Sequence, residues 1–199
     1  KIKHKQGKNV SYTDITYTTF QNDINNFGTG LAKLGYKDKR VAVIGKNSYE
    51  WALTYFSVLN GLGVLVPLDK GLPEAEIELS LQRSKADIIV FEKEYENIIK
   101  KILNEKTTSL KQAVCMQDCE GNEIISLEAV KNIGAEELKK GNNIYTEAEI
   151  DNKKMAAIIF TSGTTSMSKA VMLSHYNIAS NIYSLQCIEK VYSDDVNMA

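Results

Sequence analysis

Hydroxyl side chains, a glycine and a lysine gather in one stretch of the chain, between Thr161 and Lys169. The stretch reads Thr-Ser-Gly-Thr-Thr-Ser-Met-Ser-Lys, and it directly follows the apolar run Ile158–Phe160. A segment that binds a polyanion needs backbone N–H groups that point inward, hydroxyl donors, and a cation that balances the charge. This stretch supplies all three, so its residues predict a loop that holds phosphate groups.

Two common phosphate-binding motifs do not fit this loop. A Walker-type loop ends in Gly-Lys followed by Ser or Thr, but here Ser168 stands where the second glycine belongs and Ala170 follows the lysine. A Gly-x-Gly-x-x-Gly dinucleotide motif follows none of the predicted strands, and Gly45-Lys46 is interpreted as a strand end that runs into a helix cap. From the residues alone, a solvated Ser/Thr/Gly hairpin stays open as the alternative.

Short apolar runs that alternate with helical patterns must position this loop. Apolar side chains at steps of three and four residues predict helices, and short continuous apolar runs predict buried strands. The predicted strands are Val41–Ile44, Val64–Pro67, Asp87–Phe91, Gln112–Met116, Met155–Phe160 and Ala170–Leu173. The predicted helices cover Phe20–Leu34, Trp51–Leu59, a segment opened by Pro73, Tyr95–Leu103 and Ile178–Leu185. The alternation predicts an α/β fold, in which a layered, largely parallel sheet has helices on both faces.

Residues that start or stop helices support this division. Gly35 is expected to end the first helix, Asn47-Ser48 and Ser174 to cap two others, and Pro73 to open one. His175 follows the Ser174 cap, and we interpret it as a capping or packing residue because no Ser/His/Asp or Cys/His set accompanies it.

Composition excludes several functional classes. The chain of 199 residues has 24 lysines and arginines against 25 aspartates and glutamates, a net charge of -1, so no overall field attracts nucleic acid. The longest apolar run, Gly61–Leu68, is shorter than the roughly 20 residues of a membrane-spanning helix. Cys115 and Cys119 have no second pair and few histidines near them, which argues against zinc, and we expect free thiols and a cytoplasmic protein.

The loop also resembles a known family. Residues 161–169, followed by Val171-Met172-Leu173-Ser174-His175, are similar to the signature loop of the acyl-adenylate-forming, or AMP-binding, superfamily, which includes acyl-CoA synthetases, adenylation domains and luciferases. The similarity extends through Ile15–Tyr17, Val41–Trp51 and Gly63–Asp69. Within the superfamily, Pro67-Leu68-Asp69 and Leu72-Pro73-Glu74 resemble the bacterial long-chain fatty acyl-CoA synthetases most.

The resemblance implies an ATP-dependent acid–CoA ligase of the AMP-forming kind. Its cofactors and substrates would be ATP, Mg²⁺, coenzyme A and a carboxylic acid, with a fatty acid expected. It also implies that His175 lies near the active site without being its key acid or base. Where the family pattern has glycine, proline and glycine, this chain has Ser166, Ser168 and Ala170. Serine still donates hydrogen bonds, and the lysine and threonines are retained.

Site residues follow from the same resemblance. Lys169 is the expected catalytic residue, as a counter-charge to the phosphates. Mg²⁺ is expected to contact Thr164. The residues expected to bind the nucleotide phosphates are Thr161, Ser162, Gly163, Thr164, Thr165, Ser166 and Lys169. Small molecules are the expected partners; nucleic acid and a transmembrane segment are not expected, and peripheral membrane contact of a longer enzyme stays open.

The expected domain organisation is an incomplete N-terminal AMP-binding domain over residues 1–199. It divides into an α/β subdomain (1–116), a polar surface excursion (117–152), and the phosphate-loop hairpin with its following helix (153–199). The resemblance places the adenine contacts, the acyl tunnel and a C-terminal domain after residue 199, so we expect this chain alone to be inactive. Two alternatives stay open: an adenylation domain or aryl-CoA ligase, and a non-catalytic, degenerate binding module.

Overall fold

The structure is a computed structural model that describes residues 2–6, 9–119, 121, 123–161, 168–190 and 192. Its strands are β1 (Ile2–Gln6), β2 (Asn9–Thr13), β3 (Lys39–Ile44), β4 (Gly63–Pro67), β5 (Ile88–Phe91), β6 (Gln112–Cys115), β7 (Ile124–Ser126), β8 (Met155–Thr161) and β9 (Lys169–Ser174). Its helices are α1 (Tyr17–Leu31), α2 (Tyr49–Ser57), α3 (Glu74–Ser84), α4 (Glu96–Glu105), α5 (Leu127–Lys139) and α6 (His175–Ile188). Short helical turns extend α1 over Ala32–Tyr36 and α2 over Val58–Leu62, and another precedes α4 at Lys93–Tyr95.

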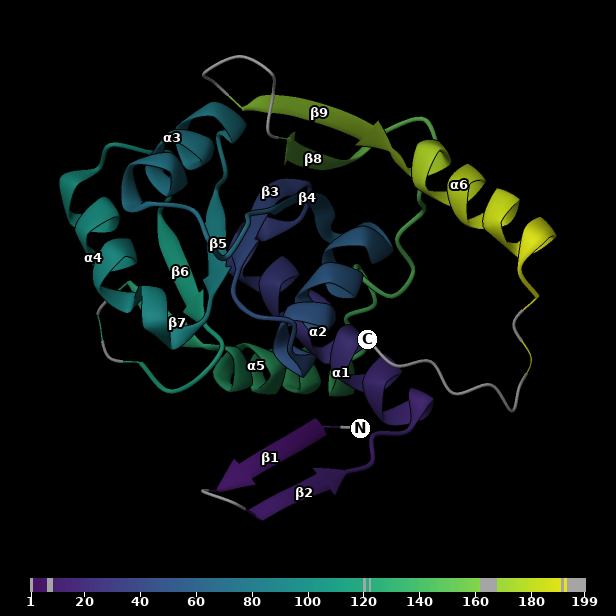
Figure 1. Ribbon diagram of the computed structural model, residues 1–199. Helices are drawn as coiled ribbons and strands as arrows, with labels where there is room; N and C mark the ends of the chain where they lie inside the picture. The colour runs from purple at the N-terminus through teal and green to yellow at the C-terminus, as the bar shows by residue number, and fades with distance from the viewer. Residues whose placement is uncertain are drawn as a thin grey trace.

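One seven-stranded sheet organises the described part of the chain, in the order β7-β6-β5-β3-β4-β8-β9 (Figure 1). Every neighbouring pair is parallel except β8 and β9, which form an antiparallel hairpin at one edge. The predicted strands are confirmed to within a residue or two at their ends. The α/β fold with a largely parallel sheet is therefore confirmed.

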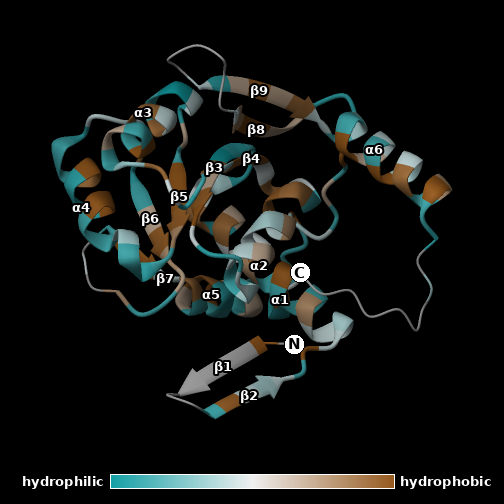
Figure 2. Cartoon of the chain, viewed as in Figure 1, coloured by the Kyte–Doolittle hydropathy of each residue, from teal (hydrophilic) through white to brown (hydrophobic). Residues whose placement is uncertain are grey.

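Helices cover both faces of this sheet, as predicted. Because successive side chains of a strand point to opposite faces, Val41 and Val43 of β3 pack into one core cluster and Ala42 and Ile44 into the other. The first cluster contains residues of α1, α2 and α5, and the second contains residues of α3 and α4. Figure 2 shows the resulting hydrophobic centre, with brown residues along the central strands. Burial on both faces explains why these strands are apolar without interruption.

The predicted helix boundaries are confirmed where a cap determines them. Gly35 has a φ of 91°, a conformation that favours glycine, and the chain leaves the helical path there. The Ser48 side chain accepts a hydrogen bond from the Trp51 N–H at the start of α2. Pro73 immediately precedes α3.

The prediction of a surface excursion over residues 117–152 is wrong for most of that segment. β7 extends the sheet by pairing with β6, and α5 packs against α1. Leu127, Val130 and Tyr145 are buried, and the Tyr145 hydroxyl donates a hydrogen bond to the Ser57 carbonyl at 3.0 Å. The segment is rich in charged residues because α5 presents one side to solvent. The sequence also has weak helical signals at Leu127–Val130 and Ala135–Leu138, and both fall within α5.

Glycines allow α1 and α5 to approach closely. A Cβ atom on Gly134 would collide with the Asn26 carbonyl oxygen of α1, and a Cβ atom on Gly30 would collide with the Val130 carbonyl oxygen of α5. The two helices are therefore in backbone contact, and neither position has room for a side chain.

A small hairpin of β1 and β2 precedes α1, and the sequence patterns did not predict it. The two strands pair with each other and not with the main sheet, and in Figure 1 they lie below α1 and α5. The described side chains of β2 are exposed. β2 alternates Val10 and Tyr12 with polar residues, but both of these side chains are exposed, so the strand has no buried face.

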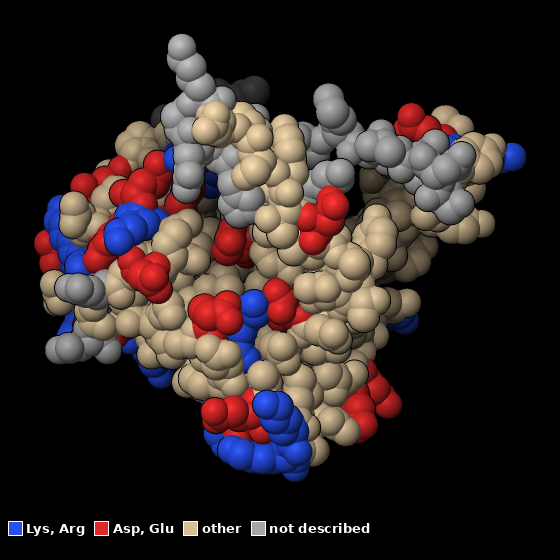
Figure 3. Space-filling model, turned by 90° about the horizontal axis from the view of Figure 1, so that it is seen from below, with Lys and Arg blue, Asp and Glu red and all other residues tan. Residues whose placement is uncertain are grey.

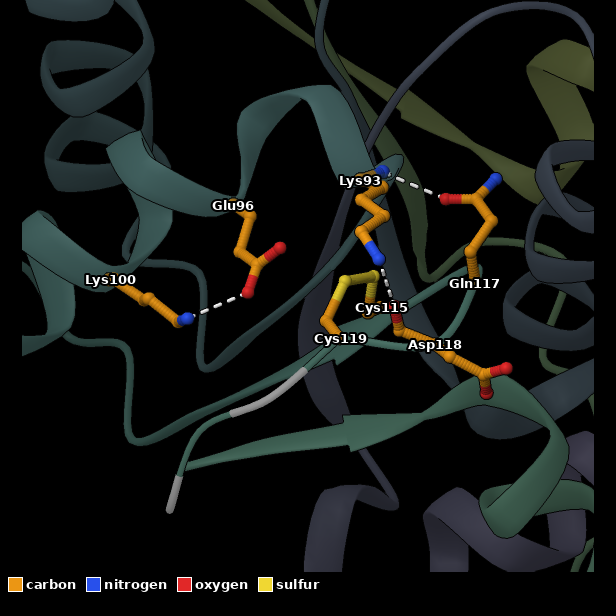
Figure 4. Close-up of a disulfide and its surroundings, with 7 residues drawn as sticks. All are labelled: Lys93, Glu96, Lys100, Cys115, Gln117, Asp118 and Cys119. Carbon is orange, nitrogen blue, oxygen red and sulfur yellow. Dashed lines mark hydrogen bonds and ion pairs between the residues drawn. A yellow bond between two sulfur atoms is a disulfide. The ribbon is translucent and has the colours of Figure 1, made fainter.

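The prediction of free thiols at Cys115 and Cys119 is also wrong, because a disulfide joins them (Figure 4). The chain turns at the end of β6 and brings the two Cα atoms to 6.0 Å. Lys93 stabilises this turn: its backbone N–H donates to the Gln117 side-chain oxygen at 2.8 Å, and its ammonium donates to the Asp118 carbonyl at 2.7 Å. Cys187 is an exposed free cysteine. The argument for a cytoplasmic protein from unpaired thiols therefore fails.

Candidate functional site

The predicted phosphate loop joins the two strands of the edge hairpin. Thr161 ends β8 and Lys169 begins β9, and the two residues are register partners at the open end of the hairpin. β8 runs parallel to β4, with Leu65 opposite Ala157, so the loop leaves the sheet at the carboxyl ends of its strands. Ligands of open α/β sheets commonly bind at this edge. The loop residues Ser162, Gly163, Thr164, Thr165 and Ser166 lie outside the described residues, so their roles stay predictions.

Lys169 stands at the base of this loop with its side chain exposed. Its side chain forms neither a hydrogen bond nor an ion pair with the residues that the structure describes. Its ammonium group therefore remains available to an anionic ligand, which is the property that the predicted role requires. Thr161, across the hairpin, is also exposed.

Arg83, at the end of α3, contacts the hairpin at the point where the loop begins and ends. Its guanidinium lies over the Phe160 ring, 5.4 Å from the centroid, and one nitrogen donates to the Ser168 carbonyl oxygen at 2.7 Å. The same nitrogen is 3.3 Å from the Ser168 hydroxyl oxygen. Sequence reasoning missed Arg83, because 85 positions separate it from Ser168 and α3 carries no motif that points to the loop.

His175 lies at the end of the hairpin opposite Thr161 and Lys169, and the position near the active site that the resemblance implied stays a prediction. The hairpin register pairs Met155 with Ser174, six residues along β8 from Thr161, which corresponds to about 20 Å of strand. His175 begins α6 after the capping box of Ser174 and Asn177, and its N–H donates to the Lys154 carbonyl. Burial lowers its pKa, and nearby Asp151 opposes that shift. The interpretation as a capping and packing residue agrees with this position.

An apolar pocket of about 400 Å³ lies between the hairpin, β4, α2 and α6. Its apolar lining includes Leu65, Ile159, Leu173 and Ile178, and Asn177 and Asn181 add amide groups. Ile159 is two residues from Thr161 along β8, so the pocket extends from the sheet toward the loop. The site therefore combines an exposed cation with an adjacent apolar surface.

Lys46, Glu92 and Glu94 form ion pairs at the carboxyl ends of β3 and β5. The Lys46 N–H donates to a Glu92 carboxylate oxygen at 2.8 Å, and its ammonium contacts Glu94 at 3.2 Å. Hydrogen bonding to Glu94 and then the charge of Glu92 raise the pKa of Lys46. Gly45-Lys46 connects the end of β3 to the Ser48 cap of α2, as the sequence indicated.

Charge on the molecular surface is mixed. On the face shown in Figure 3, blue and red side chains are interspersed without a broad area of either sign. In the part of the chain that the structure describes, His, Cys, Asp and Glu side chains do not gather in threes, so these residues offer no carboxylate set for Mg²⁺. The described helices include none that is long and apolar enough to span a membrane.

Comparison with known proteins decides the family. The family model for the AMP-binding enzyme matches residues 4–199, nearly the whole chain. The chain belongs to the AMP-binding enzyme family. Among curated relatives, the mitochondrial medium-chain acyl-CoA ligase ACSF2 of Bos taurus is 27% identical over 184 residues. Long-chain-fatty-acid–CoA ligase 5 of Mus musculus is 27% identical over 210 residues.

Solved structures of the AMP-binding fold agree with this assignment. The apo structure of Mycobacterium smegmatis MbtA superposes with a TM-score of 0.78 at 20% identity, and the match covers 93% of this chain and 33% of that one. The match to the bovine ligase covers 84% of this chain and 30% of the relative, and the match to the mouse ligase covers 96% and 30%. The chain thus spans about a third of the length of these proteins and has the fold of the N-terminal domain of acyl-CoA synthetase-like structures.

Proposed function

We propose that this chain is the phosphate-binding part of an ATP-dependent acid–coenzyme A ligase. The observation that carries the proposal is the edge hairpin of an AMP-binding family member, in which Thr161 and an exposed Lys169 are register partners beneath the loop. The acyl-CoA ligases among the relatives support the reaction class.

The proposed reaction has two half-reactions. A carboxylate oxygen of the acid attacks the α-phosphorus of ATP, the bond from that phosphorus to the bridging oxygen of pyrophosphate breaks, and acyl-AMP forms. The thiol of coenzyme A then loses its proton and attacks the acyl carbon, which gives the thioester and releases AMP. The first step brings one anion toward another, so placement and neutralisation of charge dominate its catalysis.

Lys169 supplies this neutralisation as the counter-charge to the phosphates. An exposed ammonium at the base of the loop is free to approach phosphate oxygens. The hydroxyls and backbone N–H groups of Thr161, Ser162, Gly163, Thr164, Thr165 and Ser166 are proposed to hold the β- and γ-phosphates. Thr164 is the proposed contact of Mg²⁺, which reduces the negative charge of the phosphates when bound.

A fatty acid is the proposed acid. The apolar pocket beside Ile159 and Leu173 supports an aliphatic chain next to the loop. An aromatic acid, or a carrier thiol in place of coenzyme A as in adenylation domains, is the alternative within the same reaction class. Small-molecule partners complete the proposal, and peripheral membrane contact of the longer enzyme remains open.

The test is ATP-dependent acyl-CoA formation by the full-length protein with short, medium, long-chain and aromatic acids. We expect activity that peaks on long aliphatic acids and falls when Lys169 is replaced by alanine. Lys153→Ala is a matched control, because Lys153 is exposed near the opposite end of the hairpin. Equal activity in both variants would contradict the role of Lys169, and activity confined to aromatic acids would move the assignment to an aryl-CoA ligase.

For the 199-residue chain alone we expect no ATP–pyrophosphate exchange with any acid of this panel. Exchange above that of Lys169→Ala would show that the adenylation site is complete within these residues.

A non-catalytic binding module is the second candidate, favoured by Ser168 and Ala170 where the family pattern has proline and glycine. An ATP-dependent shift in the unfolding temperature of the full-length protein separates nucleotide binding from a purely structural hairpin. A shift in the unfolding temperature without product formation would favour the degenerate module. The absence of both a shift and product would favour a structural hairpin.

A further inference from the structure

Arg83 connects two strands that the loop separates. Phe160 immediately precedes Thr161 at the end of β8, and Ser168 immediately precedes Lys169 at the start of β9. One guanidinium contacts both: it lies over the Phe160 ring and donates a hydrogen bond to the Ser168 carbonyl at 2.7 Å. A side chain from outside the hairpin therefore links the two stems of the loop.

α3 gives Arg83 a rigid support. Ile77 and Leu81 of this helix are fully buried in the core cluster that also contains Ile158 of β8. Ser84, the next residue, is buried as well. The backbone at position 83 is thus held by the core, and the arginine side chain extends to the hairpin.

We propose that Arg83 is a positioning residue for the phosphate site. By holding Phe160 and Ser168 together, it fixes the two stems of the loop and with them the distance between Thr161 and Lys169. This inference rests on the proposed function, because it assigns Arg83 a role in presenting Lys169 to the nucleotide. Arg83 itself does not touch the reacting atoms.

Arginine suits this task better than lysine. A guanidinium is planar, so one face stacks on an aromatic ring while its edge donates hydrogen bonds in a fixed direction. A lysine ammonium retains the charge but cannot stack and donate in this geometry. The Ser168 hydroxyl, 3.3 Å from the same nitrogen, adds a weaker second contact.

The test compares Arg83→Gln and Arg83→Lys in the full-length protein. Arg40→Gln is the matched control, since the Arg40 guanidinium also donates to a backbone carbonyl, but to that of Ser84 in α3 and not to one in the hairpin. The measurements are the dissociation constant for ATP, the unfolding temperature, and amide hydrogen exchange in peptides from β8 and β9. Lys169→Ala is measured in parallel as the test of the phosphate site itself.

We expect Arg83→Gln to weaken ATP binding by roughly five- to tenfold, in the range of one typical lost hydrogen bond. Exchange should accelerate in the peptides containing Phe160 and Ser168. Arg83→Lys should fall between the wild type and Arg83→Gln, and the unfolding temperature should change no more than in Arg40→Gln. A merely structural arginine would lower the unfolding temperature and leave ATP affinity unchanged.

The outcomes separate the two proposals. If Lys169→Ala weakens ATP binding and Arg83→Gln does not, the positioning role is refuted while the phosphate site stands. If neither weakens ATP binding, the proposed phosphate site fails, and the positioning role fails with it. Faster hydrogen exchange in Arg83→Gln would then support only the contact between α3 and the hairpin.

Discussion

Helix α5 buries Leu127, Val130, Gly134 and Glu137, whereas α6, one residue longer, buries none. α5 lies in backbone contact with α1 through Gly30 and Gly134. α6 projects from the end of the β8–β9 hairpin, as Figure 1 shows, with its hydrophobic residues largely exposed. The α1–α5 region stabilises the sheet, whereas the β8–β9 hairpin that precedes α6 carries the residues proposed to act on the nucleotide. Substitutions in the two regions should therefore affect different measurements.

Lys169→Ala is expected to show the largest difference between an effect on activity and an effect on stability. Loss of the counter-charge should lower kcat/KM for acyl-CoA formation by the full-length protein by about 100-fold, the usual effect of removing one preorganised electrostatic group. The unfolding temperature should stay at the wild-type value, because the side chain is exposed and has no hydrogen bond or ion pair with the described residues. A large drop in unfolding temperature would show that the hairpin region also contributes to the stability of the folded protein.

The converse is expected for Gly134→Ala. The added methyl group would collide with the Asn26 carbonyl and separate α1 from α5. We expect the free energy of unfolding to fall by about 2 kcal/mol, within the range of overpacked core positions. Urea denaturation monitored by circular dichroism measures it, and Asn132→Ala, exposed on the same helix, is the control. An unchanged midpoint would contradict the close packing of the two helices.

Two helix caps sharpen the comparison. Ser48 caps α2, which packs in the core, and Ser174 caps α6. Each Ser→Ala change should cost about 1 kcal/mol. For Ser48 this cost should appear in global unfolding, whereas for Ser174 it should appear as faster hydrogen exchange within α6 alone. Equal effects on global unfolding would show that α6 unfolds together with the sheet.

The smallest effect is expected from Glu137→Gln. Hydrogen bonds from Lys140, Asn142 and Lys33 lower the pKa of Glu137 from 4.5 to about 2. Since the folded state has the lower pKa, ionised Glu137 stabilises the protein fully above pH 4.5, and this contribution disappears as the pH falls from 4.5 toward 2. The variant should therefore be less stable than the wild type at pH 7, by a modest amount because the ion pairs are partly solvated.

The measurement is the unfolding midpoint of both proteins from pH 7 to pH 2. The two curves should converge as the pH falls toward 2. A constant difference over this range would mean that the ionisation of Glu137 does not contribute.

Local patterns predicted much of the sheet and its caps. The runs Val41–Ile44 and Val64–Pro67 are apolar without interruption because both of their faces are covered, so the sequence records their burial directly. Gly35 and Ser48 act through the backbone of their own turn, and each was recognisable without knowledge of the fold. The position of the loop at Thr161 and Lys169 followed from the strand before it.

Other features depend on contacts that sequence patterns do not contain. The segment around Gly134 was predicted to lie on the surface because it is rich in charged residues, and the backbone contact at Gly134 depends on the opposing helix α1. The Cys115–Cys119 disulfide depends on the turn after β6. His175 is close to the loop along the chain but lies at the opposite end of the hairpin, because an antiparallel strand carries the chain away from the loop.

The sequence by itself determined the chemistry of the loop, the alternation of strands and helices, and the family, because these reside in neighbouring residues and their spacing. Only the tertiary structure decided which helices pack together and which side chain holds the base of the loop. Arg83 and Ser168 meet across 85 positions, and such a contact exists only after the sheet has brought α3 beside the hairpin. Its physical basis is the burial of Ile77 and Leu81, which fixes α3 beside the hairpin.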